Sequence, residues 1–266
     1  MKVNKNLFKK DFIDLCKNFE TLYTIIGVPL VIIIIFFLFS QQHNNIYIYM
    51  RHNISLLEIE QILSSFNLET YDRSVAFYLF LWNSAYFYII TLLIIVLPTV
   101  VACTAFTSEK EQGTIELLFH APISDADLLL TKMMVSTLPS LLLAVFCYAF
   151  MLISSYFHSG VEAFKYMLQL KWILLHFILI PIYTIITAGI GLTISIVKKS
   201  SRAALTSAFF FILPLMLLMV PFVLGDLVFT LRLALYGVLL AIPLLWLVFK
   251  IALKLFDREK IILSYY

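Results

Sequence analysis

Charge is scarce in this chain, and it is nearly missing from the long stretches that dominate it. Charged residues make up 13% of the 266 residues and hydrophobic residues 62%, a balance that excludes a water-soluble globular protein. A bilayer core about 30 Å thick needs about 20 apolar residues per helix. Arg232 is the one charged residue in the six segments that meet this need: about 21–40, 79–107, 133–157, 172–197, 203–224 and 231–249. The sequence therefore predicts an all-α membrane protein with six transmembrane helices.

The chain also lacks the motifs of common membrane-embedded enzymes and of ATPases. It has no His-Glu-x-x-His, no Gly-x-Ser-x-Gly and no pair of aspartates within an apolar segment. None of its seven glycines belongs to a Gly-x-x-x-x-Gly-Lys-Ser/Thr phosphate loop. Because ion-coupled carriers usually place ionisable side chains at membrane depth, an ion-driven carrier is also disfavoured. We expect no catalytic residue, and ATP-driven work would need energy from another subunit.

Cysteine and histidine are few and do not form a metal-binding pattern. Cys16, Cys103 and Cys147 fall in the N-terminal arm and in two apolar segments, so we expect no disulfide in an external loop. The five histidines are His43, His52, His120, His158 and His176. They show no ligand spacing with one another or with cysteine. We therefore expect them in loops and at the interface, with no metal site and no cofactor bound by this chain.

The basic residues are distributed unevenly between the two faces of the membrane. One face would carry 14 Lys and Arg, in the first 20 residues and in 108–132, 198–202 and 250–260, and the other face would carry 5. Cytoplasmic loops are enriched in Lys and Arg, so both termini are predicted to be cytoplasmic. The net charge of +3 is then a topology signal, and no nucleic-acid partner is expected.

Two segments outside the apolar stretches have helical periodicity. The arm formed by residues 1–20 carries apolar side chains at helical spacing between its lysines, at Phe8, Phe12, Leu15 and Phe19. This pattern is typical of an amphipathic helix in the membrane interface. The largest outer loop, 41–78, contains a capping-box pattern from Ser55 to Glu58, which predicts one short external helix.

The loop between the second and third apolar segments carries the strongest local signals. Ser108 and Glu111 fit a reciprocal cap at the start of a helix over 109–119, and Pro122 would end that helix. Ser124 offers a second cap for the helix that follows. The apolar side chains of the short helix fall on one side: Ile115, Leu118 and Phe119. The sequence therefore predicts a short amphipathic helix held between two membrane helices.

Proline and small residues mark the apolar segments. Each segment contains or adjoins at least one proline, so kinks are expected in every helix. The prolines concerned are Pro29, Pro98, Pro139, Pro181, Pro214, Pro221 and Pro243. Gly189 and Gly191, beside Thr187 and Thr193, give the fourth segment a small-residue surface. Such a surface is suited to close helix contact, within the subunit or between subunits.

The stretch from Glu109 to Ser124, EKEQGTIELLFHAPIS, resembles the signature of ABC-2 type transporter permeases. That signature has an acidic start, Gly-Thr, a hydrophobic pair, then Pro and Ser, and a later Lys, which Lys132 matches here. The resemblance extends to the layout of amphipathic arm, six spans, long first outer loop and short link 198–203. The chain is most similar to the small, six-span bacterial permeases of this family.

The resemblance implies a single ABC-2 type transmembrane domain over residues 1–266, in a bacterial cytoplasmic membrane. Such a subunit works with a second permease subunit, identical or homologous, and with two copies of a cytoplasmic ABC ATPase that holds ATP and Mg²⁺. The 109–119 segment would be the coupling helix, anchored to the bundle by Ile115, Leu118 and Phe119. The positions that would contact the ATPase or form the turn are Glu109, Glu111, Gly113, Thr114 and Glu116.

The function implied is that of a permease subunit of an ATP-driven exporter, since nothing in the chain resembles the docking loop of importers. Without charge at depth, aromatic and hydroxyl side chains would line the path. Such walls suit an amphipathic or lipophilic substrate, either a peptide or a lipid-like molecule. The candidate wall residues are Tyr86, Tyr88, Thr91, Thr99, Tyr148 and Tyr183. An alternative is a non-transporting membrane scaffold that recruits an ATPase to a maturation or motility machine.

Overall fold

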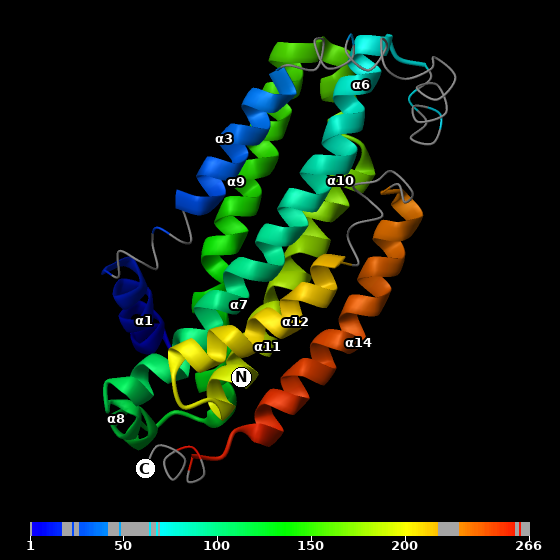
Figure 1. Cartoon of the computed structure of the whole chain (residues 1–266). Coiled ribbons are helices and arrows are strands. Elements are labelled where there is room, and N and C mark those ends of the chain that lie inside the picture. Colours follow the sequence, from blue (N-terminus) through cyan, green and yellow to red (C-terminus); the bar gives the residue numbers. More distant parts are fainter. Residues whose placement is uncertain are drawn as a thin grey trace.

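The structure is a computed structural model, and it describes residues 2–17, 23, 27–41, 48, 64, 68, 70–217, 229–258 and 261. Within this part of the chain all regular secondary structure is helical, which confirms the all-α prediction. The helices form one elongated bundle, with α1 (Lys5–Lys17) and α8 (Ile115–His120) toward one end and α6 (Arg73–Leu81) at the other (Figure 1). The remaining elements are α3 (Val28–Gln41), the π-helical turn η2 (Trp82–Tyr86), α7 (Phe87–Glu111), α9 (Asp125–Met167), α10 (Leu170–Leu174), the π-helical turn η3 (Leu175–Leu179), α11 (Ile180–Val197), α12 (Ser201–Leu217) and α14 (Leu231–Leu255).

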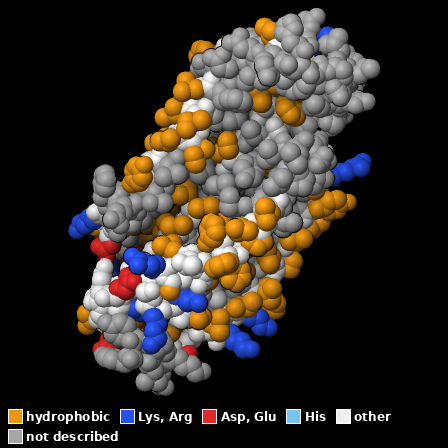
Figure 2. Space-filling view, viewed as in Figure 1, with side chains coloured by type: hydrophobic (Ala, Val, Ile, Leu, Met, Phe, Trp, Pro, Cys, Tyr) orange, Lys and Arg blue, Asp and Glu red, His pale blue; other side chains and the backbone are white. Residues whose placement is uncertain are grey.

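Among the described residues, three helical stretches are long and apolar enough to cross a membrane: α9, the continuous stretch Leu170–Val197, and α14. A shorter apolar helix covers Ser201–Pro214. Hydrophobic side chains cover the flank of the bundle, whereas most of the visible charged side chains gather near the end that carries α8 (Figure 2). The chain is therefore a multi-pass membrane protein. The count of six spans and the cytoplasmic position of the termini stay predictions.

Several helices extend beyond the apolar segments that predicted them. The helical stretch that contains the second apolar segment begins with α6 at Arg73 rather than at 79, and it continues through α7 to Glu111 rather than to 107. Helix α9, which contains the third segment, begins at Asp125 rather than at 133. Apolar composition marks the part of a helix that suits the membrane, whereas the helix ends where a cap or turn satisfies its terminal backbone groups. Parts of the first and fifth apolar segments, Pro221 and the predicted Ser55 helix lie outside the described residues.

The π-helical turns η2 and η3 lie in neighbouring helices. Pro181 is the second residue of α11, two residues after the end of η3. Because proline lacks an N–H and its ring clashes with the carbonyl four residues earlier, the preceding turn adopts the wider pattern of a π-helix. Four other prolines lie inside helices that continue on both sides of them: Pro98, Pro139, Pro214 and Pro243. A non-helical residue interrupts α9 at Gly160, where φ is 77°, a position that the proline pattern did not predict.

The small-residue surface of α11 packs inside the subunit. A Cβ atom placed on Gly191 would lie 2.7 Å from the carbonyl oxygen of Thr99 and 2.8 Å from the Cβ of Ala102, both in α7. A Cβ atom on Gly189 would lie 2.6 Å from a methyl carbon of Val248 in α14. Because these distances are too short for real Cβ contacts, the glycines allow α11 to lie close to both neighbours. Of the two alternatives that the sequence leaves open, the structure shows internal packing.

The N-terminal arm forms α1, which is fixed to the end of the bundle that carries α8. Two backbone N–H groups in its first turn donate hydrogen bonds of 3.1 Å to the side-chain oxygen of Asn4, which therefore caps the helix. Phe8 and Phe12 stack with 6.0 Å between their ring centroids, as their helical spacing predicts. Leu7 is the side chain that α1 buries in the bundle, and Phe19 lies outside the described residues.

Candidate docking site

The loop predicted to couple this subunit to a partner begins as the last turn of α7. The N–H of Gly113 donates to the carbonyl of Lys110 at 3.1 Å, and the N–H of Thr114 donates to the carbonyl of Glu109 at 2.9 Å. This pair of bonds is a Schellman motif, which requires a residue with positive φ, and Gly113 has a φ of 68°. The predicted 109–119 helix is therefore two segments, the end of α7 and the separate helix α8.

The predicted cap at Ser108 is wrong. Ser108 lies inside α7, and its hydroxyl donates to the carbonyl oxygen of Thr104 at 2.6 Å. Because α7 continues through Ser108, the backbone N–H groups near this residue already donate to carbonyls four residues earlier. A capping box therefore has no free N–H group to satisfy here. The second predicted cap is confirmed, because the Ser124 hydroxyl oxygen accepts a hydrogen bond of 3.2 Å from the N–H of Asp127 at the start of α9.

Lys110 closes the end of α11. Its ammonium group donates to the carbonyl oxygens of Ser195 at 3.1 Å, Ile196 at 2.7 Å and Lys198 at 2.8 Å. The last carbonyls of a helix have no partner within the helix, so this side chain satisfies them from outside. Lys110 is 0% exposed, and burial lowers its pKa to about 8. The ends of α7 and α11 are thereby held together.

Glu111 closes the start of α12. Its carboxylate accepts hydrogen bonds from the backbone N–H of Ser201 at 2.7 Å and from the hydroxyl of the same residue at 2.8 Å. A carboxylate at a helix N-terminus satisfies a free donor and interacts favourably with the helix dipole. Glu111 stays exposed, but its carboxylate already has a partner within the subunit.

Glu109 lies inside a network of charges that joins α1, α7 and α9. Lys10 donates to one of its carboxylate oxygens at 3.1 Å, and the ammonium of Lys132 lies 3.3 Å from the other. Lys132 also lies 3.2 Å from Asp11 and donates to the carbonyl of Ala105 at 2.9 Å. Glu109 and Lys132 are buried, so each charge depends on its partner. The structure therefore places Glu109 toward the interior of the bundle.

The C-terminal segment holds the link between α8 and α9. Arg258 donates to the carboxylate of Asp125 at 2.7 Å and to the carbonyl oxygens of Phe119 and Ile123. Its guanidinium carbon also lies 5.8 Å from the centre of the Phe119 ring. The Phe119 carbonyl belongs to the last turn of α8, so Arg258 satisfies the end of that helix.

Helix α8 buries one side and exposes the other. Ile115, Leu118 and Phe119 are 1%, 7% and 7% exposed, and they pack in a cluster that includes Leu128. Leu117 is 74% exposed, because it lies on the opposite side of the helix from those three residues. We call Leu117 and four further exposed residues of this loop the α8 rim: Gln112, Gly113, His120 and Pro122.

The predicted contact positions are spread over three environments. Gly113 belongs to the α8 rim, while Thr114 and Glu116 are half-buried beside it. Glu109 and Glu111 bind other parts of the subunit, as described above. The sequence pattern missed Leu117, although an apolar residue on the polar side of an amphipathic helix was a usable signal. It gave no signal for Lys110 or Arg258, whose partners are carbonyls that only the fold brings close.

Two of the predicted wall residues, Tyr86 and Tyr148, meet at His176. The Tyr86 hydroxyl lies 2.8 Å from Nε2 of His176, and Nδ1 of the same ring lies 2.9 Å from the carbonyl oxygen of Trp172. Because a carbonyl only accepts, Nδ1 carries a proton, and in the neutral ring Nε2 accepts from the Tyr86 hydroxyl. The Tyr148 ring centroid is 4.4 Å from that of His176. The expectation that every histidine lies in a loop or at the interface is therefore wrong for His176, which is a core residue.

Two other candidate wall residues, Thr99 and Tyr183, make their hydrogen bonds elsewhere. The Thr99 hydroxyl lies 3.4 Å from the carbonyl oxygen of Thr187, at the contact between α7 and α11. The Tyr183 hydroxyl lies 3.5 Å from the carbonyl oxygen of Gly237 in α14. The side chains of Tyr88 and Thr91 lie outside the described part of the chain.

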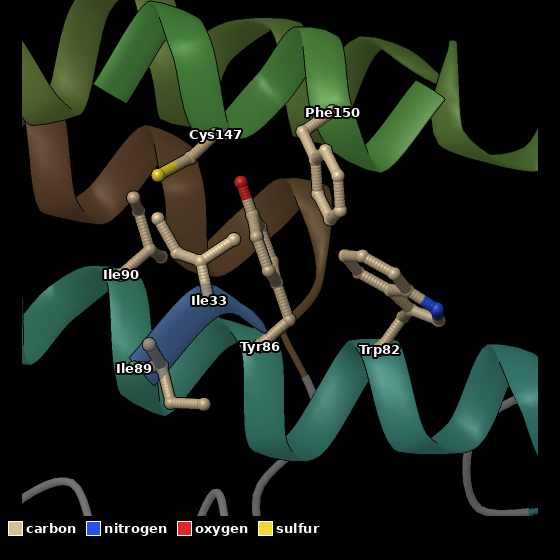
Figure 3. A pocket seen from close by; sticks show the side chains of 7 residues that line it. All are labelled: Ile33, Trp82, Tyr86, Ile89, Ile90, Cys147 and Phe150. Carbon is tan, nitrogen blue, oxygen red and sulfur yellow. The ribbon is translucent and has the colours of Figure 1, made fainter. Parts of the chain in front are cut away.

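A small apolar cavity adjoins Tyr86. The Tyr86 side chain extends from the junction of η2 and α7, with its hydroxyl directed toward α9 (Figure 3). The residues that line the cavity are Ile33, Trp82, Tyr86, Ile89, Ile90, Cys147 and Phe150. A lining of this kind suits a hydrocarbon group rather than an ion.

Comparison with known protein families gives a match that spans nearly the whole chain. The family described as ABC-2 family transporter protein matches residues 5–249. No curated protein and no solved structure matches the chain. The matched region begins with α1, includes the loop from Glu109 to Ser124, and ends within α14. The family match agrees with the resemblance that this loop carries, and the chain belongs to the ABC-2 family of transporter proteins.

Proposed function

We propose that this chain is the permease subunit of an ATP-driven exporter, and that the α8 rim is the surface on which its ATPase docks. ABC-2 permeases are generally non-catalytic transmembrane subunits that pair with an ABC ATPase. In this proposal two permease subunits in a bacterial cytoplasmic membrane bind two ATPase subunits, which hold the ATP and Mg²⁺. This chain binds neither and supplies the path.

The observation that carries the proposal is the way in which the α8 rim is supported from behind. Lys110 and Glu111 connect its first turn to α11 and α12, and Arg258 connects its last turn to the start of α9. Ile115 is 1% exposed and anchors α8 in the core. Closely packed and hydrogen-bonded contacts of this kind deform little, so a push on the rim would move the attached helices.

The exposed face of α8 has the chemistry of a contact surface. Leu117 projects from a short helix at the end of the bundle where charged side chains gather. Gln112 and His120 add exposed polar side chains to the same loop. An apolar centre with a polar surround is the usual composition of a protein interface, and it fits a groove on a soluble partner better than a lipid surface.

The proposed cargo is an amphipathic or lipophilic molecule, peptide or lipid-like, that moves outward. Support for this class comes from the apolar cavity beside Tyr86 and from the scarcity of charge in the apolar segments. The outward direction follows from the family resemblance. Rearrangement of the helices around the region of η2 and η3 would open the path, since π-helical turns are often found at functional sites.

The first test is co-purification of the tagged permease with its ATPase, followed by ATPase activity in liposomes. Leu117→Glu places a charge at the centre of the α8 rim and should reduce association by at least about tenfold, as truncation of an interface centre does. Gln169→Glu adds a charge at an exposed position between α9 and α10 and should leave association unchanged. Wild-type association of the Leu117→Glu protein would overturn the docking assignment.

Transport itself separates the exporter from the scaffold alternative. Liposomes that contain the permease and its ATPase would be loaded with a fluorescent lipid analogue or a labelled amphipathic peptide. An exporter should move one of these probes across the membrane in an ATP-dependent manner, and Leu117→Glu should abolish the movement. Stimulated ATPase activity without movement of either probe would favour the scaffold.

A further inference from the structure

A polar cluster of Asn83, Tyr166 and Lys171 lies away from α8, where η2, the end of α9 and the start of α10 meet (Figure 1). The ammonium of Lys171 donates to the Tyr166 hydroxyl oxygen at 2.7 Å, and the side-chain amide of Asn83 donates to the same oxygen at 2.8 Å. Asn83 and Tyr166 are 2% and 4% exposed, while Lys171 is half-buried. The cluster therefore reaches the surface mainly through Lys171.

The hydrogen bonds of this cluster leave donors without acceptors. The Tyr166 oxygen accepts two hydrogen bonds, which uses both of its lone pairs and leaves its own hydrogen to donate. Asn83 uses both amide hydrogens, because it also donates to the carbonyl of Leu79 at 2.8 Å. Lys171 has three hydrogens, one on Tyr166 and one directed at the Asn83 side-chain oxygen, 3.5 Å away. Among the described residues, no acceptor takes the Tyr166 hydrogen or the third hydrogen of Lys171.

The charge of Lys171 also lacks a balancing carboxylate within the described part of the chain. The ion pairs found there join Lys10, Lys132 and Arg258 to acidic residues. Lys171 instead lies over two aromatic rings, with its nitrogen 4.4 Å from the centre of Tyr166 and 5.7 Å from that of Trp172. Aromatic faces attract a cation but do not neutralise it. The cluster thus combines a positive charge with two spare donors.

We propose that Asn83, Tyr166 and Lys171 form a binding site for the anionic group of an amphiphile, a carboxylate or a phosphate. Such a group supplies the acceptors and the negative charge that the cluster lacks, through charge-assisted hydrogen bonds. Aromatic side chains continue from the cluster toward the apolar cavity: Trp172 packs against Tyr86 at 6.1 Å, and Tyr86 against Trp82 at 5.0 Å between ring centroids. These rings are buried, and the hydrocarbon part of the ligand would contact them where Trp82 and Tyr86 line that cavity.

Two sources carry this chemistry, the cargo and a phospholipid of the surrounding membrane. As a cargo site the inference rests on the proposed export function, whereas as a phospholipid site it does not. Binding can be measured without the ATPase, so a failure of the docking proposal leaves this test intact. In particular, Leu117→Glu should bind the probe as the wild type does.

The test is titration of the purified full-length protein, in a neutral detergent, with dodecyl phosphate. Trp172 contacts the cluster, so tryptophan fluorescence reports occupancy. Lys171→Gln should raise the dissociation constant by about tenfold or more, the size expected for loss of a hydrogen bond to a charged group. Tyr166→Phe removes the spare hydroxyl donor and should raise it by a smaller factor. Lys165→Gln removes an exposed lysine six residues away and should have no effect.

Two results would overturn the proposal: equal affinity of wild type and a folded Lys171→Gln protein, or equal binding of dodecyl phosphate and uncharged dodecanol. If Lys171→Gln does not fold, an unchanged affinity of Tyr166→Phe for dodecyl phosphate would also overturn the proposal. The source is decided separately, in lipid nanodiscs. Preferential retention of phosphatidylglycerol over phosphatidylcholine marks a phospholipid site, and displacement of that lipid by an exported amphiphile marks a cargo site.

Discussion

The ammonium nitrogen of Lys110 lies 2.7 Å from the carbonyl oxygen of Ile196 and joins the last turn of α7 to the last turn of α11. Its two neighbours in the sequence reach other helices, Glu109 to α1 and α9, and Glu111 to α12. Three consecutive residues therefore set the positions of five helices around the base of α8. A helix of six residues is too short to be stable alone, and these contacts explain how it presents a fixed surface.

Lys110→Met should destabilise the protein. The substitution keeps most of the apolar stem but leaves the carbonyls at the end of α11 without donors, which costs about 1–3 kcal/mol of unfolding free energy. Thermal unfolding in detergent, followed by circular dichroism, measures the change. Lys199→Met is the matched control, because Lys199 is exposed in the link that follows α11. Equal stability of the two variants would show that Lys110 is not a cap.

The same lysine should give the protein a pH-dependent stability. Burial lowers the pKa of Lys110 to about 8 in the folded protein, while an unfolded lysine keeps a pKa of about 10.4. Between these values the unfolded chain binds one more proton than the folded chain, so the free energy of unfolding contributed by this group rises with pH. Below pH 8 this contribution is constant and unfavourable to folding.

The difference in stability between the wild type and Lys110→Met isolates that contribution, since the variant has nothing to titrate at this position. We expect the difference to move in favour of the wild type from pH 8 to about pH 10.4. Melting temperatures of both proteins at pH 7, 8, 9 and 10 measure it. A difference that is flat over this range would show that Lys110 keeps an ordinary pKa.

Glu111→Gln should loosen the start of α12 without disrupting the docking surface. The amide oxygen can still accept one hydrogen bond from Ser201 but lacks the charge that favours a helix N-terminus. The loss of stability should therefore be smaller than the loss of about 1 kcal/mol expected for Glu111→Ala. Hydrogen exchange of the first turn of α12 measures the effect. Glu162→Gln, at an exposed position in α9, is the control. If Glu111→Gln lost ATPase binding while hydrogen exchange in α12 stayed unchanged, Glu111 would instead be a direct contact with the ATPase.

The general class of the fold was readable from the sequence because it depends on local composition. Long apolar stretches indicate membrane helices wherever they occur, and the cap at Ser124 acts over a few residues. The buried side of α8 was also readable, since Ile115, Leu118 and Phe119 follow helical periodicity. These signals need no knowledge of the neighbouring helices.

The long-range part of the candidate site could not be predicted in this way. Glu109, Lys110 and Glu111 look in the sequence like one solvated charged turn, but each side chain binds a partner at least 85 residues away along the chain. The cap at Ser108 failed for a related reason, since its pattern is the same whether or not the preceding helix continues. His176 was misplaced because one polar residue within an apolar run gives no indication of the Tyr86 hydroxyl that it binds.

Arg258→Gln should release the link between α8 and α9 while the rest of the bundle stays folded. Arg258 donates to Asp125, Phe119 and Ile123, and glutamine is too short and uncharged to replace the three contacts. Loss of the Arg258 contacts should leave the last carbonyls of α8 without a donor from outside the helix. The rate of proteolysis in the link should then rise by about tenfold, which corresponds to a decrease of about 1.4 kcal/mol in the free energy of local unfolding. Lys254→Gln removes an exposed charge in the last turn of α14 and should leave the rate unchanged. Because the link supports the α8 rim, the Arg258→Gln permease should also stimulate the ATPase less than the wild type when equal amounts of ATPase are bound. Normal stimulation together with faster proteolysis would show that the Arg258 contacts stabilise the link without transmitting motion.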